Sequence, residues 1–157
     1  MIDEFSQNLT NLANSLPPHS RLIGIDLGSA TIGLALSDIS RTVASPLETL
    51  KRTKFKQNAL ALSRLCDAHN VGGLILGFPL NMDGSEGPRA QATRAYMRNW
   101  QQFSSLPITL WDERLSTAAV TRTLLEVDAS RQRRAQLVDK LAATYILQGA
   151  LDRLSAR

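Results

Sequence analysis

The chain has 157 residues, of which 43% are hydrophobic and 20% charged, a composition typical of one folded domain rather than of a disordered or fibrous protein. Its apolar runs are far shorter than the roughly 20 residues of a membrane-spanning helix. Asp3 and Glu4 stand where a secretory signal would carry positive charge, so we expect a cytoplasmic protein. A single cysteine and two distant histidines exclude an internal disulfide and a zinc site of cysteine and histidine.

The net charge of +4 comes from the second half of the chain. Residues 1–84 carry seven basic and seven acidic side chains, whereas residues 85–157 carry eleven and seven. Arginines outnumber lysines 14 to 4, and the planar guanidinium matches phosphate oxygens better than an ammonium does. This pattern is typical of nucleic-acid-binding proteins, but small basic proteins without such a partner share it, so charge alone leaves both interpretations open.

Residues 1–20 are predicted to form an N-terminal extension. Four apolar residues recur there at helical spacing before Pro17 and Pro18 end any helix: Phe5, Leu9, Leu12 and Leu16. A short amphipathic helix and a loosely docked tail both fit this pattern. Residues 21–157 are predicted to form the folded body as a single domain.

The body begins with three predicted strands. Residues 22–27 and 31–36 are nearly continuous apolar runs joined by Gly28 and Ser29, which is typical of a hairpin with a tight turn. A weaker strand over residues 41–50 contains Pro46, and a proline within a strand favours an edge position.

Helices and strands alternate in the remainder. The pattern predicts a helix over 55–69, a buried strand over 71–76, a loop over 77–88, a helix from Pro88, a strand over 107–111, a helix from Ser116 to about Val127 and a last helix over about 131–154. This order predicts an α/β fold with a mixed five-stranded sheet, antiparallel in its first three strands and parallel afterwards, flanked by helices. Ligands of such sheets gather at the carboxyl ends of parallel strands.

Asp26 interrupts an apolar strand, and alternation places it on the same face as Leu22 and Gly24. An isolated ionised carboxylate is costly there unless it is paired or bound to a cation. A turn or capping role beside Gly28 is the structural alternative.

Asp139 falls in the last predicted helix, on the face that carries Ala142, Ala143 and Ile146 at spacings of three, four and seven residues. Because this stripe is small and apolar, we expect it to pack on the sheet and to carry the carboxylate inward. The alternative is a boundary position at which Asp139 pairs with a neighbour such as Arg134.

Asp112 and Glu113 directly follow the predicted strand over 107–111. A capping role at the next helix is the alternative for one of the two, and Glu113 has the longer reach. Carboxylates from a central strand, a strand end and a facing helix suit Mg²⁺ or Mn²⁺, which take oxygen ligands. Such ions activate water and stabilise the leaving oxygen of a phosphodiester, so the pattern indicates metal-dependent hydrolysis of nucleic acid.

The loop over residues 80–88 combines glycines with polar side chains and precedes a helix N-terminus, a setting that favours phosphate contact. An ordinary turn is the alternative. The candidate substrate-binding residues of this loop are Asn81, Asp83, Gly84 and Ser85.

Four arginines are further candidates for substrate contact. Arg131, Arg133 and Arg134 open the last predicted helix, where they oppose its dipole and where phosphate would offset that cost. A basic loop without a partner fits nearly as well. Arg114 either stabilises phosphate charge or pairs with Asp112, and the sequence does not distinguish the two.

Four segments resemble the signature segments of the YqgF/RuvX family, in that family's order and across nearly everything from Arg21 to Asp152. They are GIDLGSATIG at 24–33, GFPLNMDGSEGP at 77–88, WDERLST at 111–117 and VDKLAA at 138–143. The resemblance implies an RNase H-like fold and a nuclease whose three acidic positions fall on Asp26, Glu113 and Asp139. The roles of Asp112 and Asp83 stay open.

Members of that family are described as processing the 5′ end of pre-16S rRNA and as Holliday junction resolvases. The resemblance therefore implies a metal-dependent nuclease of ribosome biogenesis whose partners are pre-rRNA or branched DNA and the ribosome or its precursor. A DNA junction resolvase and a non-catalytic ribosome-assembly factor are the alternatives. The rival enzyme class is an actin-like ATPase or sugar-kinase relative, although about 137 residues cannot form the two domains that such a fold needs, and nucleotide binding would favour it.

Overall fold

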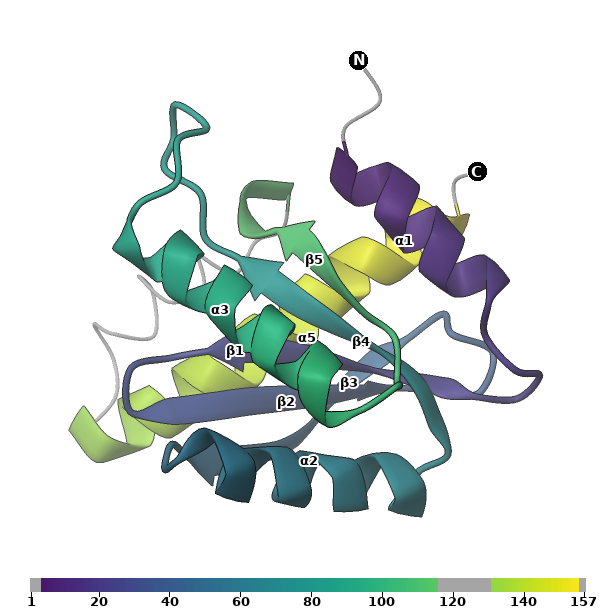
Figure 1. Ribbon diagram of the computed structural model, residues 1–157, viewed down its shortest axis with the longest axis horizontal. Helices are drawn as coiled ribbons and strands as arrows, with labels where there is room; N and C mark the ends of the chain where they lie inside the picture. Colours follow the sequence, from purple (N-terminus) through teal and green to yellow (C-terminus); the bar gives the residue numbers. More distant parts are fainter. Residues whose placement is uncertain (1–3, 116–130, 156–157) are drawn as a thin grey trace.

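The protein is described here by a computed structural model, which covers residues 4–115 and 131–155, with side chains over 4–115 and 141–155. Its elements are α1 (Glu4–Asn14), β1 (Arg21–Leu27), β2 (Thr31–Ser37), β3 (Ala44–Lys51), α2 (Phe55–Ala68), β4 (Val71–Phe78), α3 (Pro88–Phe103), β5 (Ile108–Asp112), the 3₁₀ turn η1 (Glu113–Leu115) and α5 (Arg131–Ser155) (Figure 1). The helix predicted from Ser116 to Val127 lies outside the described residues. Among the helices that are described, none has the length and apolar character needed to cross a membrane.

The five strands form one sheet in the order β3-β2-β1-β4-β5. β1 pairs antiparallel with β2, and β2 with β3, whereas β1–β4 and β4–β5 are parallel pairs. This confirms the predicted mixed sheet and the edge position of the proline-containing strand. β4 extends two residues beyond its predicted end and takes in Gly77 and Phe78.

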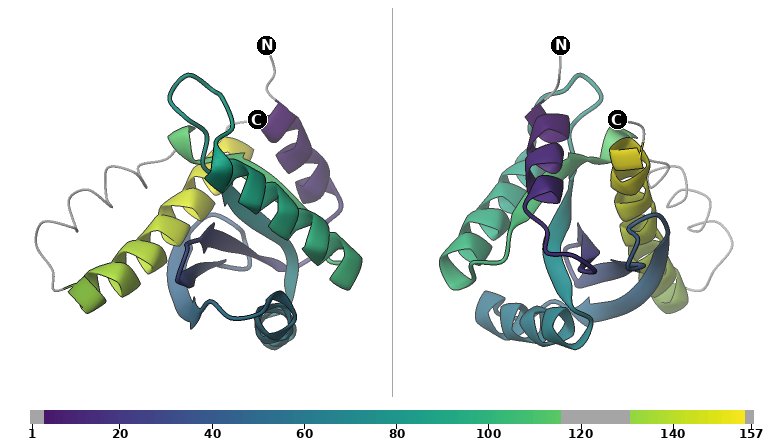
Figure 2. Two further views of the ribbon diagram at one scale, coloured as in Figure 1. Left: turned by 60° about the vertical axis from the view of Figure 1, so that its left-hand side comes forward. Right: turned by 90° about the vertical axis from the view of Figure 1, so that its right-hand side faces the viewer.

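Helices cover both faces of the sheet. Figure 2 shows α5 on one face and α2 with α3 on the other. The packing on the α5 face is close because Gly24 and the alanines of α5 meet there: a Cβ atom added at Gly24 would lie 2.6 Å from Leu147 Cβ and 3.0 Å from the Ala143 carbonyl oxygen. Ala142, Ala143 and Ile146 are buried on the sheet, as the small apolar stripe of the sequence predicts.

The carboxyl ends of β1 and β4 lie at one edge of the molecule, on the left in Figure 1. The turn 28–30 and the first residues of α2, α3 and α5 lie at the same edge. Helix N-termini therefore surround the strand ends, an arrangement that favours anionic ligands.

The N-terminal segment contains a helix, one of the two alternatives for residues 1–20. Leu9 and Leu12 of α1 are buried in the cluster that α5 forms with the sheet. Phe5 packs against Phe78 on β4 with 5.5 Å between the ring centroids. α1 thus lies against the edge strand β5 and contributes to the hydrophobic core.

Substitution of Leu9 by alanine tests this packing. Leu9 has no exposed surface, so we expect Leu9→Ala to lower the free energy of unfolding by about 2–5 kcal/mol. Chemical denaturation measures the change, and Leu60→Ala on α2, where the leucine is 40% exposed, is the matched control. Equal effects of the two substitutions would show that α1 is not part of the cooperative unit.

Candidate metal and nucleic-acid site

Asp26 lies near the carboxyl end of the central strand β1 and is only 2% exposed. It shares its strand face with Leu22 and Gly24, and both of these residues pack toward α5. The carboxylate therefore lies on the predicted face, at the edge where the parallel strands end. Asp26 is therefore a buried strand residue and not a solvated turn residue.

Glu113 follows β5 directly and is 8% exposed. Its carboxylate lies over Gly77 of β4, because a Cβ atom added at Gly77 would be 3.2 Å from Glu113 Oε1. The same Cβ would be 2.5 Å from Ile146 Cδ1 of α5. The missing side chain at position 77 thus leaves a cradle between β4 and α5 that the glutamate occupies.

Asp26 and Glu113 consequently share one face and one edge of the sheet. β1 pairs in parallel with β4, with Ile25 opposite Leu76, so Asp26 and Gly77 are next to each other in the following row. The sequence did not single out Gly77, although a glycine within a buried strand often marks a close approach of another group.

Asp139 is part of α5, but its side chain lies outside the described residues. The same holds for Arg131, Arg133 and Arg134, which occupy the first turn of that helix. Within the part of the chain whose side chains are described, no three carboxylate, histidine or cysteine side chains form a cluster that could hold a metal. Of the three predicted acids, Asp26 and Glu113 are those whose side chains are described, and both are buried.

Asp112 and Leu110 are two residues apart on β5, so their side chains lie on the same face of the sheet. Leu110 packs on the face opposite α5. Its buried carboxylate accepts two hydrogen bonds at 3.1 Å from Arg114 Nε and one at 2.8 Å from Arg114 Nη2. The backbone N–H of Arg114 also donates to Asp112 Oδ1 at 2.9 Å. Of the two alternatives for Arg114, the structure therefore contains the pair with Asp112, and the two neighbouring acids have different surroundings.

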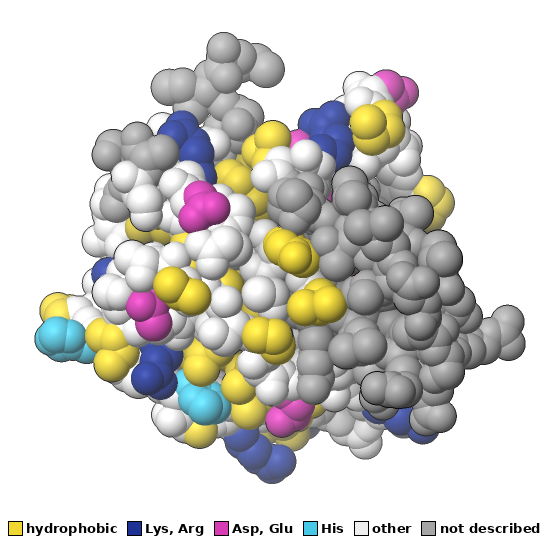
Figure 3. Space-filling model, turned by 180° about the vertical axis from the view of Figure 1, so that it is seen from behind, with side chains coloured by type: hydrophobic (Ala, Val, Ile, Leu, Met, Phe, Trp, Pro, Cys, Tyr) yellow, Lys and Arg dark blue, Asp and Glu magenta, His cyan; other side chains and the backbone are white. Residues whose placement is uncertain are grey.

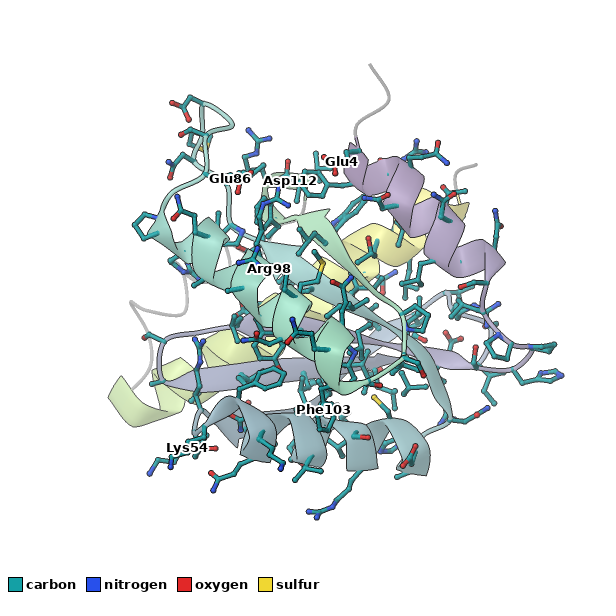
Figure 4. The ribbon with its side chains drawn as sticks, viewed as in Figure 1. Glu4, Lys54, Glu86, Arg98, Phe103 and Asp112 are labelled. Atoms are coloured by element: carbon teal, nitrogen blue, oxygen red, sulfur yellow. The ribbon has the colours of Figure 1, made fainter. Side chains whose placement is uncertain are left out.

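Arg114 also reaches the loop between β4 and α3. Its Nη1 donates to the carbonyl oxygens of Asn81 and Met82 at 3.5 and 3.4 Å. At the other end of the loop, Arg94 of α3 forms a salt bridge of 2.7 Å with Glu86. Figure 4 shows Glu86 and Asp112 at the same end of the molecule. The two arginines hold the loop beside the strand that leads to Glu113.

The predicted substrate-binding residues of the loop bond mainly with one another. Asn81 Nδ2 donates to Ser85 Oγ at 2.9 Å, and the Ser85 hydroxyl and N–H donate to Asp83 Oδ1 at 2.6 and 2.9 Å. These bonds from Ser85 lower the pKa of Asp83, so its carboxyl stays ionised at neutral pH. Gly84 has a φ of +88°, a conformation that favours glycine. The loop is therefore a compact, exposed turn with ordered polar side chains.

Loss of the Arg114 side chain should loosen this loop. We expect Arg114→Ala to increase severalfold the rate at which an aspartate-specific protease cuts between Met82 and Asp83, because the guanidinium bonds to Asp112 and to the loop carbonyls disappear together. Arg98→Ala, at an exposed position of α3, is the control and should leave the rate unchanged. Equal rates for Arg114→Ala and wild type would contradict the role of Arg114 in holding the loop.

Comparison with known protein families gives one match across most of the chain. The family model RuvX, described as Holliday junction resolvase, matches residues 20–153. Relatives from Paramagnetospirillum magneticum and Methylocella silvestris are 59% and 58% identical over 144 and 146 residues. These alignments cover 92% and 93% of this chain and 93% and 91% of the relatives. Both relatives are named "Putative pre-16S rRNA nuclease".

Solved structures of Holliday junction resolvases share the fold. Thermus thermophilus RuvC, solved with a Holliday junction substrate, aligns with a TM-score of 0.53 and 13% identity over 87% of this chain and 97% of that protein. The yeast mitochondrial resolvase Ydc2 aligns with a TM-score of 0.51 and 11% identity over 94% and 84% of the two chains. At these identities the comparison concerns the fold alone, and it confirms the predicted RNase H-like architecture.

Proposed function

This chain belongs to the RuvX family of nucleases, and we propose that it is a metal-dependent nuclease that processes the 5′ end of pre-16S rRNA, with Asp26, Glu113 and Asp139 as its catalytic acids. The observation that carries the proposal is the cradle at Gly77. It lets the Glu113 carboxylate lie over β4, on the same sheet face and edge as the buried Asp26.

The donor set fits a hard divalent cation. Two carboxylates on one buried face repel each other unless positive charge compensates them, and oxygen donors are the ligands that Mg²⁺ and Mn²⁺ prefer. Asp26 and Glu113 would hold such ions. When bound, ions of this class lower the pKa of a coordinated water and offset charge on phosphodiester oxygens. The chain's own contribution is to orient both carboxylates and to shield them from bulk water.

Backbone positions support Asp139 as the third acid. α5 packs on β1 where Ala143 faces Gly24, and α5 begins at the edge where β1 ends (Figure 1). Residue 139 precedes Ala143 by four residues, or about 6 Å of helix. Asp26 follows Gly24 by two residues, or about 6–7 Å of strand, toward the same edge. Both residues therefore lie on the side of the Gly24 contact that faces the edge where β1 ends.

The same edge carries the proposed substrate contacts. The loop residues Asn81, Asp83, Gly84 and Ser85 lie between β4 and the N-terminus of α3, whose partial positive charge attracts phosphate. The arginines at 131, 133 and 134 open α5 with no acidic residue in its first turn. For Arg114, the bonds to Asp112 and to the loop support a positioning role rather than direct contact with substrate.

We assign RNA as the substrate because relatives that are 56–59% identical, and cover more than nine-tenths of this chain, carry a pre-16S rRNA nuclease name. The cytoplasm and the ribosome precursor are the setting that follows. The description of the family model favours a second candidate, cleavage of branched DNA.

A cleavage assay separates these functions. We expect the protein with Mg²⁺ or Mn²⁺ to cut an RNA that contains the 5′ leader of 16S rRNA, and to leave it intact when EDTA is added. A four-way DNA junction is the parallel substrate. Cleavage of the junction alone would establish the resolvase. Binding of either nucleic acid without cleavage under any metal condition would favour a non-catalytic assembly factor.

A further inference from the structure

We propose that the end of β3 and the start of α2 form a second phosphate-binding site, which holds the backbone of the nucleic acid at a phosphate other than the one that is cleaved. The site consists of Lys51, Arg52, Lys54 and Lys56, here called the α2 cluster. This inference rests on the proposed function in so far as the ligand is a nucleic-acid strand.

The α2 cluster concentrates positive charge in six residues. It contains three of the four lysines of the chain, and all three are exposed. The salt bridges Arg94–Glu86 and Arg114–Asp112 do not involve the cluster. Figure 3 shows the described Lys and Arg side chains on the opposite face as separate patches.

The positive charges lie at the N-terminus of α2, where they lower the stability of the helix. α2 has 14 residues with no acidic side chain in its first turn, and its N-cap residue Lys54 makes no capping hydrogen bond with its side chain. The first N–H groups of a helix lack intrahelical partners and attract anions, whereas cations there are unfavourable. A bound phosphate would accept hydrogen bonds from those N–H groups and would also offset the positive charge of the lysines.

A buried hydroxyl next to the cluster also lacks a partner. Tyr96 of α3 is 6% exposed, and its Oη has no hydrogen-bond partner among the described residues. It lines a cavity of about 240 Å³ together with Arg52, Thr53 and Asn99. Burial raises the pKa of Tyr96 to about 12, and the nearby charge of Arg52 opposes this increase. An orphaned donor in a cavity that Arg52 also lines suits a ligand that brings an acceptor oxygen.

The backbone connects the α2 cluster to the acidic residues. Arg52 Nη1 donates to the carbonyl oxygen of Gly28 at 2.7 Å, and the Arg52 N–H donates to the Ala30 carbonyl oxygen at 2.9 Å. The turn 28–30 follows the strand that carries Asp26, so the cluster and Asp26 lie at the same edge of the sheet. Figure 4 shows Lys54 at this edge, at the start of α2. A strand cleaved at the acids would continue across the turn onto the cluster.

Binding measurements in EDTA test the site without cleavage. The probe is the fluorescein-labelled 16S leader RNA, and fluorescence anisotropy gives its affinity as a function of salt concentration. For Lys54→Ala/Lys56→Ala we expect about tenfold weaker binding at 0.1 M salt. The slope of log K against log salt should fall by about 1.4, because each single-strand phosphate contact contributes about 0.7. The charge-matched control is Arg64→Ala/Arg98→Ala, at exposed positions farther along α2 and on α3.

Tyr96→Phe tests the hydroxyl separately. It should weaken binding severalfold without lowering the thermal stability, since it removes a buried donor that has no partner in the described structure. Unchanged binding by Tyr96→Phe would remove Tyr96 from the site. Equal loss of affinity and of slope in the lysine and arginine double variants would overturn the site itself, even if the wild-type protein cleaves RNA. A loss confined to the lysine variant would support the site even if no cleavage were found.

Discussion

Replacement of Asp26 by asparagine is expected to lower the rate of metal-dependent cleavage by about 10³-fold or more while nucleic-acid binding persists. Asparagine has the same shape but no charge, so the buried face loses one of the two described carboxylates that would hold a cation. In our proposal, binding depends instead on phosphate contacts by the loop, the arginines of α5 and the α2 cluster, which the substitution leaves in place. Single-turnover cleavage and fluorescence anisotropy with the same RNA measure the two effects.

Thermal unfolding with and without Mn²⁺ distinguishes a metal ligand from a residue that only stabilises the fold. A cation that binds the folded state raises the unfolding temperature of the wild-type protein, and Asp26→Asn should reduce that increase. Asp67→Asn, at an exposed position of α2, is the matched control and should cleave RNA and respond to Mn²⁺ as the wild type does. Retention of full cleavage by Asp26→Asn would refute the assignment of the catalytic acids.

The sheet could be predicted because short stretches of the sequence specify each of its strands. Continuous apolar runs, the turn at Gly28 and Ser29 and the proline in the edge strand each specify one element, and the element order then restricts the topology. The face of Asp26 follows from strict alternation along β1 in the same way. The packing of Leu9 and Leu12 was less predictable, because an amphipathic helix of 11 residues does not reveal which surface it will cover.

The different surroundings of Asp112 and Glu113 could not be predicted, because the alternation of side chains between the two sheet faces ends where the strand ends. Asp112 is the last residue of β5 and keeps the strand parity, whereas Glu113 begins the 3₁₀ turn. Only the three-dimensional structure shows that this turn brings Glu113 over Gly77 while Arg114 turns back to Asp112. The side chains of these two adjacent acids thus lie on opposite faces of the sheet.

The net charge of a long segment does not reveal the α2 cluster. The first 84 residues are neutral overall, and that balance conceals four cations within residues 51–56. The charge of residues 51–56 taken alone indicates the cluster. Its link to the turn 28–30 is a tertiary contact between residues 24 positions apart, which the sequence does not predict. Local charge density predicts a patch, and only the fold indicates which site the patch adjoins.

Substitution of Gly77 by alanine should damage both stability and catalysis. The added Cβ would lie 2.5 Å from Ile146 Cδ1, so the core must shift, at a cost of about 1–3 kcal/mol in the free energy of unfolding. It would also lie 3.2 Å from Glu113 Oε1 and displace the carboxylate. A misplacement of about 1 Å can reduce the rate about 100-fold, so for a shift of a few tenths of an ångström we expect a loss of about 3- to 10-fold in single-turnover cleavage.

A double variant separates the two effects of Gly77→Ala. Ile146→Val removes the Cδ1 atom that the new methyl group meets, so Gly77→Ala/Ile146→Val should regain part of the stability that Gly77→Ala loses. The contact with Glu113 remains, so cleavage should stay low. Ile146→Val alone is the control, with a cost of about 0.5–1.5 kcal/mol and cleavage near the wild-type rate. Recovery of cleavage together with stability in the double variant would mean that Gly77 serves only the packing of α5, and the Glu113 carboxylate would then have no demonstrated need for the cradle.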